Sequence, residues 1–516
     1  MIPNILSWII FLPIIGAVAV LLVPKNERRD EIVKWLSAGF TGLQLILAIM
    51  IFMKFDRTTT AMQFEEKASW IASYNIWYYV GIDGLSVTMV LLTALLSFIC
   101  IFASWGISKS VKGYFALFLL LDAGMMGVFS ALDFFLFYIF WEVMLLPMYF
   151  LIGIWGGPRR EYAAIKFFLY TLFGSVLMLI ALLVLYFNVK DPVTGGHTFN
   201  MLHMMDQSNH IGLLTHFNVR LLLYAALFIG FAIKVPAFPF HTWLPDAHVE
   251  APTAISVILA GVLLKMGTYG MLRISFPVFP DAVKYGPFAY GFATIAVISI
   301  VYAAFCAMAQ KDLKKLVAYS SIGHMGVVML GMIGLTPLGM NGAVLQMFNH
   351  GTVTAMLFLL VGVIYDRAHH RDVDGFGGLA QQMPLYTGII TIAFFANLGL
   401  PGLSSFISEA FSFLGAFSST TFDLKIYTMV STLAIVLVAG YMLWTLQRMF
   451  LGKLNPKYTD LPEIDRRELF TLVPLAVIVI YLGIFPSTIL DMMEVTLNNL
   501  VVVVKEANPA MWGLGQ

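Results

Sequence analysis

Four ionisable residues lie inside long apolar runs, where a charge is costly. Lys234 interrupts LLLYAALFIGFAIKVPAF and Lys265 interrupts AISVILAGVLLKMGTYGML, while Glu142 and Glu409 lie in FFLFYIFWEVMLLPMYFLI and FANLGLPGLSSFISEAFSF. Each run is long enough to lie in a bilayer, and a charge at its centre costs about 2.5–3.5 kcal/mol on insertion scales. We therefore expect these four groups to carry charge through a membrane.

Each buried charge needs a partner, and the sequence offers one for Lys234. Glu142 has the opposite sign and lies on a different apolar run, so pairing the two lowers the desolvation cost of both. A nearby carboxylate keeps a buried lysine protonated, so a change in their separation would change its proton affinity. Lys265 and Glu409 could extend the line of charges.

Two histidines in apolar runs could bridge these charges. His324 lies in SSIGHMGVVML and His350 in LQMFNHGTVTAMLFLL. Histidine titrates near neutral pH and can pass a proton between its two ring nitrogens. Taken alone, such a histidine is more often a hydrogen-bonded core residue. One buried ion pair can also be purely structural, but several ionisable groups on separate runs favour a functional line.

Composition identifies a membrane protein and excludes a redox centre in this chain. Of 516 residues, 60% are hydrophobic and 11% are charged, against about 25% charged in soluble domains. Cys100 and Cys306 lie in apolar segments and predict neither a disulfide nor a metal site. The sequence contains no dinucleotide fingerprint, P-loop, CxxC pair or haem motif, so any redox cofactors are expected in other chains.

Apolar runs of about 20 residues predict an all-α polytopic protein with about fourteen transmembrane helices, in one transmembrane domain over residues 1–516. The predicted spans are 4–23, 31–53, 84–105, 112–131, 133–155, 162–187, 219–240, 250–273, 286–309, 312–335, 340–365, 384–415, 428–450 and 469–489. The long hydrophilic stretches are 54–80, 188–218 and 452–468.

The basic residues predict the orientation of these spans. Loops after odd-numbered spans hold 19 lysines and arginines and the other loops hold 9; Lys234 and Lys265 complete the total of 30. The positive-inside rule then places both termini outside the cytoplasm. No positive charge precedes the first apolar run, so that run is expected to be a retained helix rather than a cleaved signal.

Prolines break two of the predicted spans. Pro236 and Pro239 lack an N–H, so the carbonyls of Ala232 and Val235 are expected to lose their helical partners. Pro401, between two glycines, breaks the twelfth span in the same way. Paired breaks in two halves of a transporter mark the transport path. Because the breaks are five spans apart, we expect inverted five-helix repeats, with spans 4–8 at 112–273 and spans 9–13 at 286–450.

Several long motifs resemble the antiporter-like subunits of NADH:quinone oxidoreductase, respiratory complex I. They are FLFYIFWEVMLLPMYFLIGIWGG (135–157), VPAFPFHTWLPDAHVEAPTAISVILAGVLLKMGTYGMLR (235–273), LVAYSSIGHMGVVMLG (316–331) and FNHGTVTAMLFLLVG (348–362). The resemblance covers essentially the whole chain and is greatest to the M-type members. Glu409 stands where the L and N types typically carry lysine, and the chain ends too soon after the last span for the long lateral helix of the L type.

The resemblance implies proton translocation by a membrane-arm subunit with no redox chemistry of its own. It implies that Glu142 and Lys234 form the switch, that Lys265 is the central lysine, that His324 and His350 relay protons, and that Glu409 is the terminal acid. NADH, FMN, iron–sulfur clusters and quinone would bind partner subunits. Neighbouring L and N subunits and membrane lipids would be its partners, with no nucleic acid, in the inner (plasma) membrane.

Other readings of the sequence stay open. The fold is shared by subunits of multi-subunit cation/proton antiporters, and a non-transporting scaffold could keep the charges for assembly. The sequence does not distinguish protons from sodium. His369 and His370 beside acidic residues could bind a metal, although a solvated loop is the simpler reading. Asp133 is expected to cap a helix, and Asp122 has no predicted role.

Overall fold

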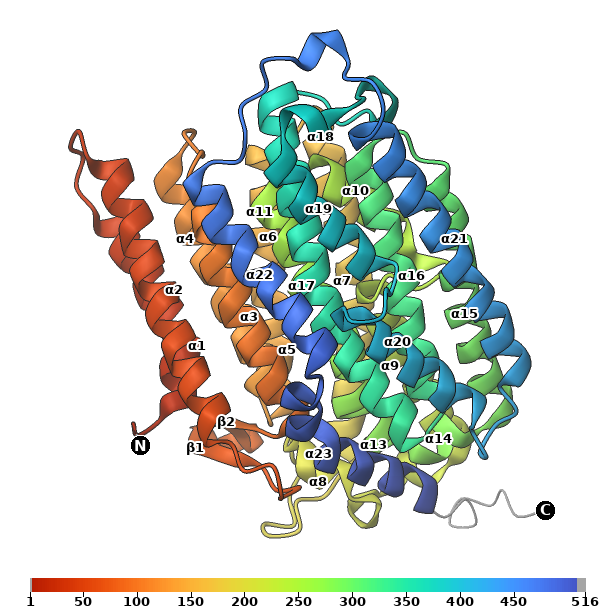
Figure 1. The fold of residues 1–516 in the computed structure, drawn as a ribbon. Coiled ribbons are helices and arrows are strands. Elements are labelled where there is room, and N and C mark those ends of the chain that lie inside the picture. Colours follow the sequence, from red (N-terminus) through yellow and green to blue (C-terminus); the bar gives the residue numbers. More distant parts are fainter. Residues whose placement is uncertain (1, 508–516) are drawn as a thin grey trace.

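Helices dominate the molecule because a chain in lipid must satisfy its backbone hydrogen bonds internally. The computed structural model describes residues 2–507, and within that range fourteen helices are long and apolar enough to cross a membrane. Most of them stand side by side with roughly parallel axes, whereas the last, Ser487–Glu506, lies across one end of the bundle (Figure 1). The predicted all-α architecture of about fourteen spans is therefore confirmed.

The first half of the bundle comprises α1 (Ile5–Leu22), α2 (Arg29–Lys54), α3 (Gly84–Ala103), α4 (Val111–Ser130), α5 (Phe134–Val143), α6 (Leu145–Trp155), α7 (Arg160–Asn188), α8 (Met201–Met205), α9 (Phe217–Lys234), α10 (Trp243–Glu250), α11 (Thr253–Ile258), α12 (Leu264–Gly270) and α13 (Phe276–Val278). The second half comprises α14 (Pro280–Lys284), α15 (Gly286–Met308), α16 (Leu313–Ile333), α17 (Pro337–Ala368), α18 (Leu379–Gln382), α19 (Pro384–Asn397), α20 (Ser404–Phe417), α21 (Lys425–Phe450), α22 (Arg466–Ile484) and α23 (Ser487–Glu506).

Both predicted breaks are present. The seventh span stops at Lys234 and resumes as α10, and the twelfth consists of α19 and α20 separated by residues 398–403. One detail of the prediction is wrong. The carbonyl of Ala232 keeps a partner because the N–H of Ala237, which lies between the two prolines, donates to it at 2.9 Å.

The N-terminus and α23 lie at the same end of the bundle, which we call the terminal face; the other end is the opposite face (Figure 1). Helix α23 was not predicted, because it is apolar on one side only. The buried side chains recur at helical spacing, and most of the side chains between them are exposed or half-buried; the buried ones are Ile489, Met492, Met493, Leu497, Val501 and Val504. Gly84 at the start of α3 allows close contact, since a Cβ there would lie 2.4 Å from the Met492 carbonyl oxygen.

A β-hairpin on the terminal face was also missed. Strands β1 (Gln63–Ile71) and β2 (Ile76–Ile82) pair antiparallel within the stretch predicted only as hydrophilic. The Glu66 carboxylate accepts hydrogen bonds from the backbone N–H of Leu6 at 2.7 Å and of Ser7 at 3.1 Å. It therefore satisfies free N–H groups at the start of α1, and the hairpin fixes that helix.

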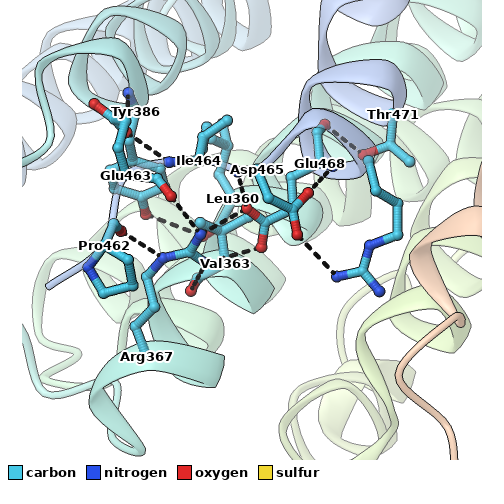
Figure 2. A network of polar contacts seen from close by, with 11 residues as sticks. Leu360, Val363, Arg367, Tyr386, Pro462, Glu463, Ile464, Asp465, Glu468 and Thr471 are labelled. Atoms are coloured by element: carbon cyan, nitrogen blue, oxygen red, sulfur yellow. Dashed lines mark hydrogen bonds and ion pairs between the residues drawn. The ribbon is translucent and has the colours of Figure 1, made fainter.

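A polar network secures the opposite face (Figure 2). Arg367 of α17 forms an ion pair with Glu468 of α22, with N···O 2.7 Å, and its Nε donates to the Pro462 carbonyl at 2.8 Å. Glu463 accepts from the backbone N–H groups of Leu385 and Tyr386 at 2.8 and 3.2 Å. The network thus joins α17, α19 and α22 to the loop between α21 and α22.

Candidate proton-transfer site

The first broken helix places Lys234 at the end of α9. Helices α7 and α9 approach closely because both carry glycine at the contact: a Cβ on Gly230 would lie 2.7 Å from the Gly174 carbonyl oxygen. This contact brings Phe167 of α7 beside Lys234, which is 1% exposed. Its Nζ lies 5.2 Å from the ring centre of Trp141 and 5.5 Å from that of Phe167.

The expected direct ion pair between Glu142 and Lys234 is not made. The described residues include no N···O contact of 4.0 Å or less between them, and Lys234 Nζ and Glu142 Oε1 both lack a hydrogen-bond partner. Glu142 instead lies beside the hydroxyls of Ser175 and Tyr138. The aromatic faces near Lys234 supply part of the missing stabilisation, so the structure holds the pair in a separated arrangement.

Lys265 lies at the centre of the eighth span, fully buried. Helix α12 follows a π-helical turn, Leu259–Leu263, and Lys265 Nζ donates a short hydrogen bond to the Ala260 carbonyl in that turn. Such turns recur at functional sites in helices. Nζ also lies 2.7 Å from Nδ1 of His350 on α17, whose Nε2 has no hydrogen-bond partner. Since a protonated lysine is only a donor, this contact requires Nδ1 to accept.

His324 and Glu409 continue the line on α16 and α20. The ring centres of His350 and His324 are 5.4 Å apart, and His324 Nδ1 lies 3.1 Å from Glu409 Oε1. His324 is 6% exposed and Glu409 is 7% exposed. The structure therefore brings Lys265, His350, His324 and Glu409, from four spans, into one buried row, which we call the polar axis. Its two histidine rings are neighbours that make no direct hydrogen bond to each other.

The second break makes room for Glu409. Gly399 has φ 76°, which favours glycine, and a Cβ there would lie 2.8 Å from Glu409 Oε2. Amides complete the contacts: Gln346 Nε2 donates to Glu409 Oε1 at 3.3 Å, and Asn397 Oδ1 lies 3.1 Å from His324 Nε2. Sequence reasoning did not select these two amides, because amides in apolar helices are commonly structural.

His248 is a further residue that sequence reasoning missed. It lies on α10 within the quoted motif HTWLPDAHVEAP, is fully buried and stacks on Phe358 with ring centres 4.5 Å apart. Neither ring nitrogen has a hydrogen-bond partner, and the ring is in electrostatic range of Lys265. The feature of the sequence that could have identified His248 is its position shortly after a broken helix. The described residues contain no direct contact joining Lys234 to Lys265, and His248 lies on the helix that follows Lys234 in the chain.

The two aspartates of the fourth and fifth spans have structural partners. Asp133 caps α5, accepting from the backbone N–H of Phe135 and Leu136 at 3.0 and 3.1 Å, so that prediction is confirmed. Asp122 is fully buried away from the polar axis, and Ser97 Oγ donates to it at 2.6 Å.

The histidine pair on the opposite face has an aromatic environment. His370 stacks on Phe376 with ring centres 4.4 Å apart, and its Nε2 makes a short hydrogen bond with the Tyr458 hydroxyl. Among residues 2–507, no group of three or more His, Cys, Asp or Glu side chains is placed to hold a metal ion.

Known proteins with similar sequences and structures point to one family. Residues 131–436 match the family model described as "NADH:quinone oxidoreductase/Mrp antiporter, TM". NADH-quinone oxidoreductase subunit M of Rickettsia prowazekii (strain Madrid E) is 39% identical over 501 residues, covering 96% of this chain and 99% of the relative.

Two solved structures share the architecture. A chain of respiratory complex I from Thermus thermophilus with bound NADH superimposes with a TM-score of 0.86 at 26% identity, covering 97% of this chain and 99% of that chain. A chain of the Mrp complex from Dietzia sp. DQ12-45-1b superimposes with a TM-score of 0.82 over 99% of both chains. At 20% identity the second likeness shows the fold alone.

Proposed function

The chain belongs to the membrane subunits of the NADH:quinone oxidoreductase/Mrp antiporter family, and from that membership we propose that it moves protons along its polar axis. Its sequence groups it with subunit M of NADH-quinone oxidoreductase, whose membrane arm it matches in fold. The observation that carries the proposal is the row of neighbouring buried titratable groups from Lys265 through His350 and His324 to Glu409.

The separation of Glu142 and Lys234 is the proposed switch. When the carboxylate approaches the ammonium group, the proton on Lys234 is held more tightly; when it withdraws, the burial of Lys234 favours release. The structure holds these groups apart, with the lysine over Trp141 and Phe167. A proton released there passes towards Lys265, with His248 as a candidate intermediate on α10.

The second half of the path runs along the polar axis. Lys265 donates to Nδ1 of His350, and His350 passes a proton from its Nε2 side towards His324. The His324 ring then transfers it to Glu409, whose Oε1 lies 3.1 Å away. Glu409 releases the proton towards the terminal face, which we assign to the outside of the inner (plasma) membrane from the distribution of basic residues.

The proposed assembly places the remaining chemistry in other chains. NADH, FMN, iron–sulfur clusters and quinone would be held by partner subunits, and L- and N-type antiporter-like subunits would flank this one in the membrane. We also propose that residues 112–273 and 286–450 are inverted repeats, because each contains one broken span that carries a buried charged residue, Lys234 in the first and Glu409 in the second. The cation/proton antiporter alternative is less favoured, because identity to the Mrp chain is 20% and to subunit M is 39%.

Glu142→Gln in the assembled complex tests the switch. Removing the charge but keeping the side-chain shape should lower NADH-driven proton pumping by about tenfold. The reason is that a change of about 1.4 kcal/mol in the free energy of proton binding to Lys234 changes the binding constant tenfold. Pumping would be measured in closed vesicles beside the NADH:quinone reductase rate. Glu161→Gln, an exposed carboxylate at the start of α7, is the matched control. Normal pumping with a normal reductase rate in Glu142→Gln would refute the switch.

A further inference from the structure

A small cavity lies beside Glu409, between α15, α16, α20 and α21. Its volume is about 30 Å³, which is enough for at least one water molecule. Glu409 and His324 line one side, and Ser320, Ser431 and Tyr441 supply hydroxyl groups to the remaining wall. The cavity therefore connects the last residue of the polar axis to helix α21, which the proposed mechanism does not use.

Two buried hydroxyl groups that line this cavity have no hydrogen-bond partner, and a buried amide of Asn397, which is outside the lining, also has none. Tyr441 is 1% exposed and its hydroxyl is unpaired, and Ser431 is fully buried with an unpaired Oγ. Asn397 uses its Oδ1 at His324, but its Nδ2 is unpaired. The Tyr441 hydroxyl lies near the side chains of Ser320 and Asn397 and within electrostatic range of Glu409. Buried polar groups normally have partners, and a water needs two to four of them, so these hydroxyl groups could hold a water among the otherwise mostly apolar residues of the lining.

The cavity runs in the direction expected of a proton outlet, from Glu409 towards the terminal face. Helix α21 begins at Lys425 on the terminal face, and Ser431 is six residues along it, about 9 Å at 1.5 Å per residue. Tyr441 lies ten residues further on, about 15 Å deeper in the membrane. Helix α20 runs in the opposite direction to α21, from the break towards the terminal face, so Phe413 lies nearer that face than Glu409. The cavity thus leads from Glu409 towards that face.

We propose that this cavity is the hydrated outlet of the polar axis and that Tyr441 positions the water that accepts the proton from Glu409. This inference rests on the proposed function. In the step, the O–H bond of protonated Glu409 breaks, its electron pair stays on the carboxylate, and a new O–H bond forms on the water. The Tyr441 hydroxyl accepts from or donates to that water, and Ser431 holds the next hydration position towards the terminal face.

Tyr441→Phe in the assembled complex tests the outlet, with Tyr427→Phe as the matched control. Tyr427 is on the same helix but does not line the cavity, so its variant removes the same hydroxyl elsewhere. We expect a cryo-electron microscopy map to show ordered density beside Glu409 in the parent complex and in Tyr427→Phe, and weaker density in Tyr441→Phe. Coupled proton pumping should fall about fivefold in Tyr441→Phe alone, the effect of one hydrogen bond.

Glu409→Gln separates failure of the outlet from failure of the proposed function. If Glu409→Gln pumps normally, the polar axis itself is not the proton path. If Glu409→Gln is impaired while Tyr441→Phe pumps like Tyr427→Phe, or if the parent cavity shows no water density, the outlet is overturned. A structural role for Tyr441 would instead lower the amount of assembled complex without changing pumping per complex.

Discussion

At the scale of single residues, the buried charges differ in how they are stabilised. Lys265 has a carbonyl and a histidine nitrogen within hydrogen-bond distance, whereas Lys234 has only aromatic faces. An unpaired buried charge is costly, and its proton is easily lost or gained when the surroundings change. This asymmetry suits a lysine that must change protonation state near Glu142 and a second lysine that passes the proton on.

Outside the spans, His210 gives the molecule a pH-sensitive contact. Burial lowers the pKa of the His210 imidazole to about 4; the Met204 carbonyl, 2.8 Å from Nε2, opposes this shift, and the Arg220 cation, 2.6 Å from Nδ1, adds to it. The His210 imidazole is therefore neutral in the folded protein. The stability that this gives is fully present above about pH 6.5, the pKa of the same group in the unfolded chain. That stability is lost as the pH falls from about 6.5 towards 4, amounting to about 2 kcal/mol at pH 5.

Hydrogen–deuterium exchange of residues 200–216 measures this effect. After correction for intrinsic exchange, protection should be lower at pH 5 than at pH 7. His210→Gln keeps hydrogen-bonding groups but cannot titrate, so its protection should not change with pH. Equal protection at both pH values in the parent protein would contradict the prediction.

At the scale of elements, small residues and single polar side chains determine how the helices meet. Gly174 and Gly230 set the distance between α7 and α9, and Gly399 leaves space for the terminal acid. Asp122 of α4 is a polar side chain that makes a contact between helices. Ser97 of α3 donates a hydrogen bond to Asp122. Gln44 of α2 lies near the same carboxylate, and its amide donates to the Ile9 carbonyl of α1 at 3.0 Å. Asp122 thus adds a buried polar contact between α3 and α4 where the N-terminal helices pack on them.

Substitution of Asp122 should separate a hydrogen-bonding role from a proton-carrying one. Asp122→Leu leaves the buried Ser97 hydroxyl without its acceptor and should destabilise the subunit by about 1–3 kcal/mol. Asp122→Asn can accept from Ser97 and donate to Gln44, so it should cost less than about 1 kcal/mol and pump normally. Heat-induced dissociation of the purified complex measures the first effect. A pumping defect in a stable Asp122→Asn complex would place Asp122 on a proton path.

At the scale of the whole molecule, charge decides orientation and the two faces are secured differently. The terminal face is held by the hairpin and α23, and the opposite face by the network around Arg367 and Glu468 (Figures 1 and 2). Most of the basic loop residues lie towards the opposite face, which we propose faces the cytoplasm. An apolar belt with many exposed leucine, isoleucine and phenylalanine side chains lies between the two faces.

Single cysteines test this orientation. In a background without Cys100 and Cys306, Thr60→Cys reports the terminal face and Thr459→Cys the opposite face; both positions are exposed. A membrane-impermeant maleimide should label Thr60→Cys in intact cells and Thr459→Cys only in inverted vesicles. Labelling of Thr459→Cys in intact cells would show that the positive-inside assignment is wrong.

The fold class, the breaks near Pro236 and Pro401, and the four residues of the polar axis could all be predicted from the sequence. These follow from local facts: the length of apolar runs, the missing N–H of proline and the cost of charge in lipid. The sequence did not determine α23 or the hairpin, since one-sided apolar patterns and short strands give weak signals.

Which of the buried charges touch depends on how the helices pack. Lys265 and His350 are 85 residues apart and meet at 2.7 Å, whereas Glu142 and Lys234, of opposite sign, do not meet. The π-helical turn before α12, the glycine contacts and the rings around Lys234 set these distances through packing. Charge type tells which side chains need partners, but the partner is chosen by how the helices pack.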